Sequence, residues 1–165
     1  MKLLITGGLG FIGSNFILHT LKKHKKLQIQ NLDAHLPGSN INNVSELKTN
    51  KNYKTIRGNI TNARLVEKLV STSDVIINFA AESHVDRSIS DPKPFIDSNI
   101  YGVYTLLEAI RKHKKKLIQI SKISSIIFSS KISNLLDSIF AKKKIEIIKC
   151  LSFHRLLCYI NLKCL

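Results

Sequence analysis

The chain opens with MKLLITGGLGFIGSN, residues 1–15, where a short apolar run meets a cluster of glycines and a second apolar pattern begins. Gly7, Gly10 and Gly13 have G-x-x-G-x-x-G spacing between a predicted strand and a predicted helix. In a dinucleotide site the first glycine allows the tight turn, the second admits a pyrophosphate, and the third packs helix on strand. The helix amides would then face the phosphates. The stretch favours a dinucleotide site over an ordinary glycine-rich turn.

An acid at the expected distance strengthens this interpretation. Asp33 ends the second predicted strand, twenty residues beyond Gly13. Its carboxylate can accept hydrogen bonds from the adenosine ribose hydroxyls and would repel a 2′-phosphate, so NAD is predicted in preference to NADP. The alternative is an aspartate that starts a turn or caps a helix. Asn59 follows the third predicted strand and is placed to meet the adenine edge, although by itself it could be an ordinary loop residue.

Length and composition predict a single globular domain with a core. The chain has 165 residues, of which 44% are hydrophobic. We expect no membrane span and no signal peptide, because no apolar run approaches ~18 residues and the N-terminus lacks the signal pattern. Cys150, Cys158 and Cys164 have no metal-ligand spacing. They are therefore interpreted as free thiols of a cytoplasmic protein, and no metal site is expected.

The net charge of +15 raises the question of nucleic-acid binding. The lysines cluster at residues 22–26 and 112–116, where two predicted helices end. Basic residues there complement the helix dipole. No basic face interleaved with aromatic residues and no nucleic-acid motif accompanies them. We therefore expect no specific nucleic-acid partner, because charge alone indicates solubility and non-specific attraction.

Strands and helices are predicted to alternate along the chain. Strands are expected near residues 27–33, 53–57, 74–81 and 117–121, and helices near 10–24, 40–47, 61–70 and 94–112. Thr61 is the expected cap of the third helix. Ile96, Ile100, Val103, Leu107 and Ile110 keep helical period in the fourth helix. The alternation predicts an α/β fold with a doubly wound parallel sheet, whose ligands bind at the carboxyl ends of the strands.

The loop after the fourth predicted strand carries many polar and ionisable side chains. Ala80 and Ala81 would let a cofactor approach closely, and Glu82, Ser83, His84, Asp86, Arg87 and Ser88 follow. Packing gives little reason for so many ionisable groups in one loop, which favours a binding role. Taken singly, His84 could be a surface histidine, and Asp86 with Arg87 a local ion pair.

Together, TGGLGFIGSNF, NLD, NFAAESHVDRSI, DSNIYGVYTLLEA and LIQIS resemble the N-terminal half of dTDP-glucose 4,6-dehydratases. These enzymes are NAD-dependent epimerase/dehydratase members of the extended short-chain dehydrogenase/reductase group. The resemblance covers residues 1–121 and implies a Rossmann-like domain. It implies a cytoplasmic lyase that acts on a nucleotide sugar, with a homodimer as one assembly to consider. The sequence leaves the identity of the sugar open.

The resemblance also implies which residues contact the cofactor and the sugar. Besides the three glycines, the implied NAD contacts are Phe11, Ile12, Asp33, Asn59, Ile60, Ala80, Ala81, Ser83 and Ser98. Ser83 and His84 would lie at the boundary between cofactor and sugar substrate. This chain departs from the family pattern at Asn59, where the family has Asp. It departs again at residues 34–37, where Ala-His-Leu-Pro replaces Lys-Leu-Thr-Tyr.

The largest departure follows Ser121. The family continues with Thr-Asp-Glu and later a Tyr-x-x-x-Lys pair, whose Tyr takes the sugar hydroxyl proton as hydride passes to NAD. Here Lys122, Ile123 and Ser124 follow instead. Tyr159 and Lys163 do have Y-x-x-x-K spacing, but in a chain so rich in lysine this coincidence is weak. No catalytic residue is therefore assigned securely.

The predicted domains are an NAD-binding domain at residues 1–121 and an atypical tail at 122–165. Every glycine lies at or before Gly102 and every proline at or before Pro94, so the tail lacks turn residues. A frameshifted or truncated gene would explain this change, and the tail could still form a helix and a strand. The leading hypothesis is the NAD-binding portion of a dehydratase, inactive as this chain. The alternatives are a non-catalytic NAD-binding module and a related nucleotide-sugar epimerase.

Overall fold

The computed structural model describes residues 1–83 and 89–119 of the chain. Met1–Gln119 forms one compact unit by its own contacts. The predicted domain boundary at residue 121 and the tail at 122–165 lie outside the described residues. In the part of the chain that is described, no helix has the length and apolar character needed to cross a bilayer.

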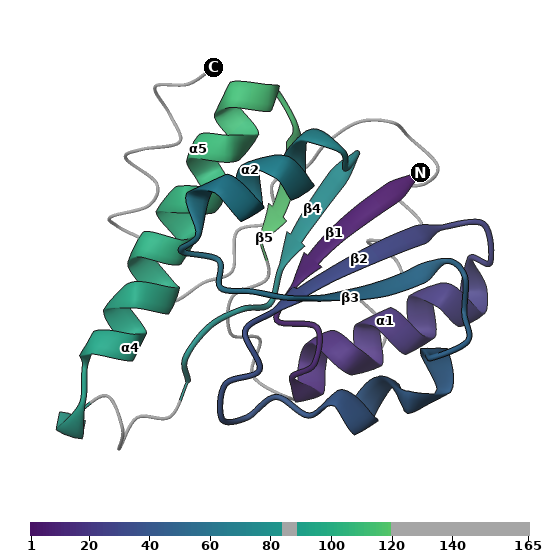
Figure 1. Ribbon diagram of the computed structural model, residues 1–165, viewed down its shortest axis with the longest axis horizontal. Helices are drawn as coiled ribbons and strands as arrows, with labels where there is room; N and C mark the ends of the chain where they lie inside the picture. Colours follow the sequence, from purple (N-terminus) through teal and green to yellow (C-terminus); the bar gives the residue numbers. More distant parts are fainter. Residues whose placement is uncertain (84–88, 120–165) are drawn as a thin grey trace. The chain divides into compact units, whose positions relative to one another are not determined.

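The unit is built on a five-stranded sheet in which every neighbouring pair of strands is parallel (Figure 1). In chain order the strands are β1 Lys2–Thr6, β2 Gln28–Asp33, β3 Tyr53–Arg57, β4 Val75–Asn78 and β5 Lys116–Gln119. Their spatial order is β3-β2-β1-β4-β5. The chain therefore winds outward from β1 in one direction and then crosses back to β4. This confirms the doubly wound parallel sheet, whose ligand crevice is expected where the order reverses, beside β1.

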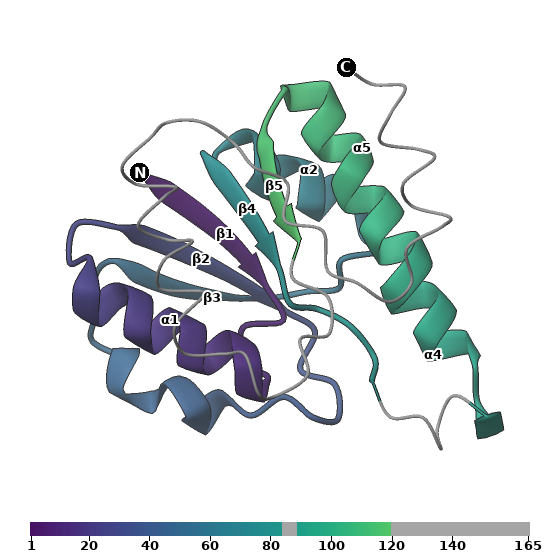
Figure 2. The ribbon, with the colours of Figure 1, turned by 180° about the vertical axis from the view of Figure 1, so that it is seen from behind.

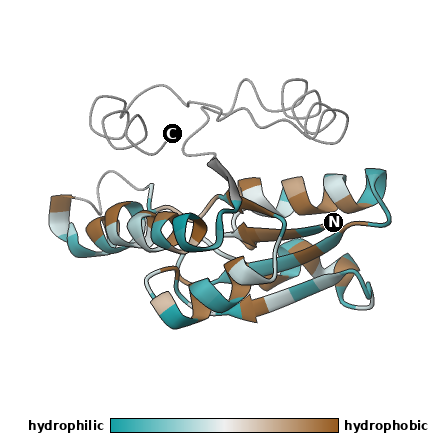
Figure 3. Ribbon diagram, turned by 90° about the horizontal axis from the view of Figure 1, so that it is seen from above, coloured by the Kyte–Doolittle hydropathy of each residue, from teal (hydrophilic) through white to brown (hydrophobic). Residues whose placement is uncertain are grey.

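Helices cover both faces of the sheet, as the two opposite views show (Figures 1 and 2). The helix α1 Phe11–Lys23 and the 3-10 helix η1 Ile41–Leu47 lie on one face and contact each other. On the other face, α2 Ala63–Ser71 packs against α5 Val103–His113. Hydrophobic and hydrophilic residues alternate along these helices, as expected of helices with one buried side (Figure 3).

The core between the sheet and the α2–α5 layer comes from apolar residues of both. Its buried members are Leu4, Leu32, Ile60, Val66, Leu69, Val70, Ile76, Leu106, Ala109 and Ile110. All four residues of β4 are buried, which agrees with the apolar run expected of a parallel strand covered on both sides. That strand ends at Asn78, so Ala80 and Ala81 lie just beyond it rather than within it.

The cap of α2 was predicted wrongly. Asn62, and not Thr61, is the N-cap, because the Asn62 side-chain oxygen accepts a hydrogen bond from the Leu65 amide at 3.1 Å. The Thr61 amide instead donates to the Asn59 side chain at 3.0 Å, in a turn that precedes the helix. Asparagine is at least as favourable as threonine at an N-cap position. Because Thr61 belongs to the turn before the helix, Asn62 occupies the cap position.

The long helix before β5 contains a wide turn that the sequence did not reveal. Its segments α4 Lys93–Ile96 and α5 are joined by the π-helical segment η2 Asp97–Gly102. A π turn holds more residues than an α turn, so the apolar face shifts around the helix. Ile96 and Ile100 are consequently 43% and 60% exposed, and the buried face begins at Gly102. Of the five apolar residues with helical period, Val103 and Ile110 are buried and Leu107 is partly buried, whereas Ile96 and Ile100 are exposed.

Basic residues stand in the last turns of α1 and α5, as predicted from the lysine clusters. One of them also joins the two helices of the second layer. Lys112 of α5 donates to the Glu67 carboxylate of α2 at 2.5 Å, and His113 Nε2 lies 3.5 Å from the same oxygen. The hydrogen bond from Lys112 is the main reason that the pKa of Glu67 is lowered from its ordinary value of 4.5.

This lowered pKa predicts a pH-dependent contribution to stability. Because the folded state favours the ionised Glu67, the contribution is present above about pH 4.5 and is lost as the pH falls through the lowered value. We expect Glu67→Gln to lower the melting temperature at neutral pH and to match the parent in strong acid. The matched control is Glu46→Gln, an exposed residue of η1. An equal difference between parent and Glu67→Gln at every pH would contradict the prediction.

Candidate functional site

The three spaced glycines occupy three different environments in the loop between β1 and α1. Gly7 has φ +69°, and a Cβ there would lie 2.5 Å from the Ala80 nitrogen. A Cβ on Gly13 would lie 2.5 Å from the Gly7 carbonyl oxygen, so this position needs glycine for close packing of helix on loop. A Cβ on Gly10 meets only the Gly7 oxygen, at 3.4 Å. The fold itself therefore leaves room for a Cβ atom at Gly10.

Two side chains of β2 accept hydrogen bonds from main-chain amides of this loop. The Gly8 amide donates to the Asn31 side-chain oxygen at 3.0 Å, and the Leu9 amide donates to Asp33 Oδ2 at 2.9 Å. The other carboxylate oxygen of Asp33 accepts the His35 amide at 2.9 Å. Asp33 is only 6% exposed. These contacts fix the acid at the end of β2, with lone pairs of both oxygens still available to a ligand.

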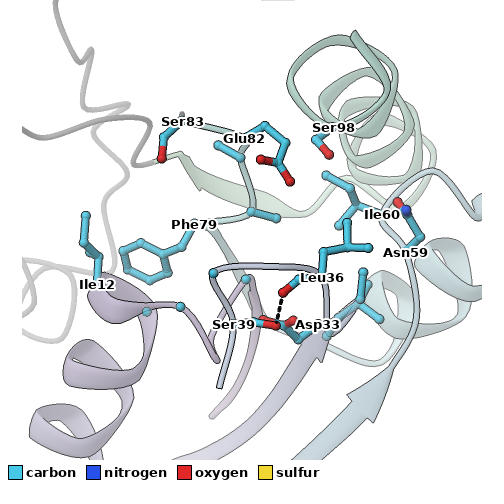
Figure 4. A pocket seen from close by; sticks show the side chains of 18 of the residues that line it. Ile12, Asp33, Leu36, Ser39, Asn59, Ile60, Phe79, Glu82, Ser83 and Ser98 are labelled. Atoms are coloured by element: carbon cyan, nitrogen blue, oxygen red, sulfur yellow. Dashed lines mark hydrogen bonds between the residues drawn. The ribbon is translucent and has the colours of Figure 1, made fainter. Parts of the chain in front are cut away.

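A cleft of about 340 Å³ opens at the carboxyl ends of the strands (Figure 4). It brings together every cofactor-contacting residue expected from the sequence. These are Gly7, Gly10, Phe11, Ile12, Gly13, Asp33, Asn59, Ile60, Ala80, Ala81, Ser83 and Ser98. His84, expected beside the substrate, and the Tyr159 and Lys163 pair lie outside the described residues.

The N-terminus of α1 faces this cleft. Phe11, Ile12 and Gly13 form its first turn and line the cleft, and that turn carries no acidic residue. The first amides of a helix have no partner within the helix and carry a partial positive charge. Because Gly10 brings no side chain in front of them, they are accessible to an anion. Such a helix end is a ready site for a phosphate group.

The opposite wall joins the segment after β4 to the π-helical segment. The Asn99 side chain accepts the Glu82 amide hydrogen bond at 2.9 Å and donates to the Glu82 carbonyl at 3.0 Å. Ser98, the neighbour of Asn99, lines the cleft. At the end of the same segment, Gly102 packs so closely on Ile60 that a Cβ would lie 2.3 Å from the Ile60 side chain. The wide turn thus positions one wall of the cleft.

Sequence reasoning missed part of the lining. The additional residues are Leu32, Ala34, Leu36, Pro37, Gly38, Ser39, Gly58, Phe79 and Glu82. Residues 36–39 lie between a predicted strand and a predicted helix, and no local pattern indicates that this segment folds back over the cleft. Two hydrogen bonds to the Leu9 carbonyl bring it there, from the Asn40 amide at 3.0 Å and from Asn43 Nδ2 at 2.9 Å. The Ser39 hydroxyl closes the turn by donating to the Leu36 carbonyl at 2.8 Å (Figure 4).

Phe79 was also missed, although it lies within the quoted motif. Its ring is 5.2 Å from that of Phe16 in α1, centroid to centroid, and the two planes are tilted by 52°. This aromatic contact fixes the segment after β4 against α1, next to Ile12 (Figure 4). The only signal that could have found Phe79 is its place between a buried strand and two alanines.

The chemistry of the lining suits binding more than catalysis. Among the described lining residues the ionisable side chains are two carboxylates, Asp33 and Glu82, and no histidine, lysine or arginine is among them. Across the described residues, no group of three or more histidine, cysteine or acidic side chains could hold a metal ion. The site therefore combines carboxylate oxygens that can accept hydrogen bonds from ribose hydroxyls, a helix N-terminus that can bind a phosphate, and apolar walls. These features define a doubly wound α/β domain of the dinucleotide-binding class.

Comparison with known proteins agrees with this class and narrows it. The family model described as GDP-mannose 4,6 dehydratase matches residues 4–128. The chain belongs to this family. It is 41% identical over 121 residues to the dTDP-glucose 4,6-dehydratase of Mycolicibacterium smegmatis, covering 73% of this chain and 36% of the relative. The resemblance drawn from the sequence is confirmed.

Solved structures give the same result. The dTDP-glucose 4,6-dehydratase of Bacillus anthracis, determined in complex with NAD, shares 39% identity with a TM-score of 0.66 and covers 74% of this chain and 37% of its own. A double mutant of the Streptomyces venezuelae enzyme DesIV, also with NAD, shares 32% identity with a TM-score of 0.70 and covers 74% and 39%. The chain spans little more than a third of the length of the relatives that it matches.

The glycine environments predict contrasting effects on stability. Gly7→Ala should lower the free energy of unfolding by about 2 kcal/mol or more, because the left-handed backbone costs ~1–2 kcal/mol and the new Cβ displaces the backbone at Ala80. Gly10→Ala should change it by less than about 0.5 kcal/mol. Urea unfolding followed by circular dichroism measures both variants. Equal losses would show that the open environment of Gly10 is wrongly described.

Proposed function

We propose that this cleft binds NAD. The observation that carries the proposal is that Asp33, the open position at Gly10 and the first turn of α1 all line one cleft. The fit is specific, since Gly10 leaves the space that a pyrophosphate needs and the helix end supplies its donors. Asp33 would accept the adenosine ribose hydroxyls with the lone pairs that the Leu9 and His35 amides leave free.

This placement of NAD also assigns cofactor contacts to other residues that line the cleft. Asn59 and Ile60 would contact the adenine, because they follow β3, beyond the Asp33 end of β2. Ala80, Ala81 and Ser83 follow β4, on the other side of β1, and would contact the nicotinamide half. Ser98 would close the cleft from the helix side. Small residues on the β4 side let the cofactor pass close to the backbone.

We further propose that this unit is the NAD-binding portion of a nucleotide-sugar dehydratase that acts on dTDP-glucose. The supporting observation is the similarity to dTDP-glucose 4,6-dehydratases over residues that include the whole described unit. In that reaction NAD would supply hydride chemistry: hydride abstraction at C4 of the sugar, water loss across C5 and C6, and hydride return to C6. The net change is the loss of one water, with no change in the cofactor.

Within this chain, Ser83 is the described residue proposed to lie at the boundary between cofactor and sugar. His84 is proposed beside it from the sequence. A homodimer and a cytoplasmic location remain predictions from the sequence.

The test of NAD binding uses the residue whose replacement spares the fold. Gly10→Val should lower NAD affinity at least a hundredfold, because the side chain would occupy the space in front of the helix end. Isothermal titration of NAD measures the loss, and circular dichroism shows that the variant is folded. The control is Ala63→Val, which adds a similar side chain at an exposed residue of α2 that does not line the cleft. Undiminished NAD affinity in a folded Gly10→Val protein would refute the proposed site.

A second prediction concerns turnover by the 165-residue chain. We expect no conversion of dTDP-glucose with added NAD, because Lys122, Ile123 and Ser124 replace the Thr-Asp-Glu of the family. Loss of a general acid or base typically lowers the rate ~10²- to 10⁴-fold per group. The 4-keto product is measured by its absorbance in alkali. Turnover that disappears in Tyr159→Phe would show that the chain has a working active site. Turnover of UDP-glucose instead would favour the epimerase alternative.

A further inference from the structure

A second cavity lies on the sheet away from the cleft that holds Asp33. It is a groove of about 650 Å³, and its described lining shares no residue with that cleft. Its floor comes from the first residues of β1, β2 and β3, and its wall comes from α2. The groove therefore lies toward the amino ends of these strands, whereas the cleft opens at their carboxyl ends.

This basic groove is lined by four lysines. They are Lys2, Lys51, Lys54 and Lys68. Within residues 1–83 and 89–119 their ammonium groups make no ion pair or hydrogen bond, and the described lining includes no acid. The two acids on or just after α2 are engaged elsewhere. Asp74 Oδ2 accepts the Lys2 main-chain amide at 2.7 Å, and Glu67 pairs with Lys112. The positive charge of the basic groove is therefore uncompensated by the fold.

The strand β3, which borders the basic groove, is an edge strand of the described sheet. It pairs with β2 on one side, from Tyr53 to Arg57. Figure 1 shows β3 at one edge of the sheet and α5 at the other. In the described residues no strand pairs with the outer edge of β3, so main-chain groups there have no strand partner. Such an edge is a template to which an extended segment can add.

The basic groove offers apolar surface beside its charges. Ile56 and Leu65 both line it, and each is partly buried against the core of the α2–α5 layer. Lys54 and Ile56 are two residues apart on β3, so their side chains share the face that α2 borders. A strand added beside β3 would place every second side chain on this face as well. Acidic side chains at those positions would be attracted by Lys54 and Lys68.

We propose that the basic groove and the outer edge of β3 together bind an extended acidic segment of another protein, which adds as a strand beside β3. In this mode main-chain hydrogen bonds supply affinity and the lysines supply specificity. The proposal is independent of NAD binding, because the basic groove and the cleft have separate linings.

Charge complementarity selects this occupant over two others. A second copy of this chain would bring a net charge of +15 to the same lysines, and lysine at a sheet edge discourages pairing between identical edges. Residues 122–165 are also rich in lysine, and their only acids are Asp137 and Glu146. A nucleic acid would match the lysines but would leave the main-chain edge of β3 unused, which favours a peptide.

The experiment uses the full chain and a capped, fluorescein-labelled peptide of alternating glutamate and valine. The peptide is about six residues long, the usual length of a strand. Fluorescence anisotropy at low ionic strength measures its binding. The same peptide with N-methylated main-chain amides keeps the charge but cannot donate hydrogen bonds to β3. We expect it to bind about tenfold more weakly or worse, because several hydrogen bonds are lost.

A pair of matched double variants tests the lysines. Lys54→Gln/Lys68→Gln should weaken peptide binding about five- to twentyfold, since an exposed ion pair contributes up to about 1 kcal/mol. The control Lys22→Gln/Lys48→Gln removes two charges from exposed residues at the ends of α1 and η1, outside the basic groove. It should change the affinity less than about twofold, because salt and water screen distant charges. Circular dichroism shows that both variants are folded.

Each alternative outcome has a distinct meaning. Equal weakening by the two double variants would overturn the proposal, because the attraction would then come from net charge. Undiminished affinity of the N-methylated peptide would overturn the addition of a strand to β3. An oligothymidylate that binds more tightly than the peptide, and less tightly to Lys54→Gln/Lys68→Gln, would assign the basic groove to nucleic acid instead. Sedimentation of the parent as a dimer that Lys54→Gln/Lys68→Gln alters would assign it to a second copy. Absence of peptide binding by the parent would also overturn the proposal.

Discussion

Two buried side chains of β2 hold the glycine loop in place, and the cleft depends on them. Asn31 and Asp33 are two residues apart on one strand, so their side chains share a face of the sheet, and each accepts a loop amide. A buried amide without a partner would cost about 1–3 kcal/mol. Asn31 also donates to the Tyr53 hydroxyl at 2.9 Å, which extends the support to β3. The loop is thus shaped before any ligand arrives.

This arrangement gives the cleft an unusual balance of charge. Its attraction for phosphate comes from the main-chain amides of α1 and not from lysine or arginine, since the described lining contains neither. Its acids are both fixed, Asp33 by the amides it accepts and Glu82 through its backbone bonds to Asn99. The helix end and the two acids are therefore separate features of one cleft.

The chain belongs to the GDP-mannose 4,6 dehydratase family, and it spans little more than a third of the length of the relatives that it matches. Every described lining residue of the cleft nevertheless belongs to the compact unit Met1–Gln119. The cleft proposed to bind NAD therefore lies entirely within this unit, whereas the resemblance places the acid–base residues of the family after Ser121.

Sequence by itself determined the strands, the alternation with helices, the three glycine positions and Asp33, because periodicity and turn chemistry are local properties. It also identified twelve of the described residues that line the cleft, although it missed others such as Phe79. Only the tertiary structure decided the rest. The fold-back of residues 36–39 onto Leu9, the shift of the helix face by η2, and the clamp of Asn99 on Glu82 depend on contacts between distant segments. Such contacts leave no periodic signal in the chain, since each partner is ordinary in its own surroundings.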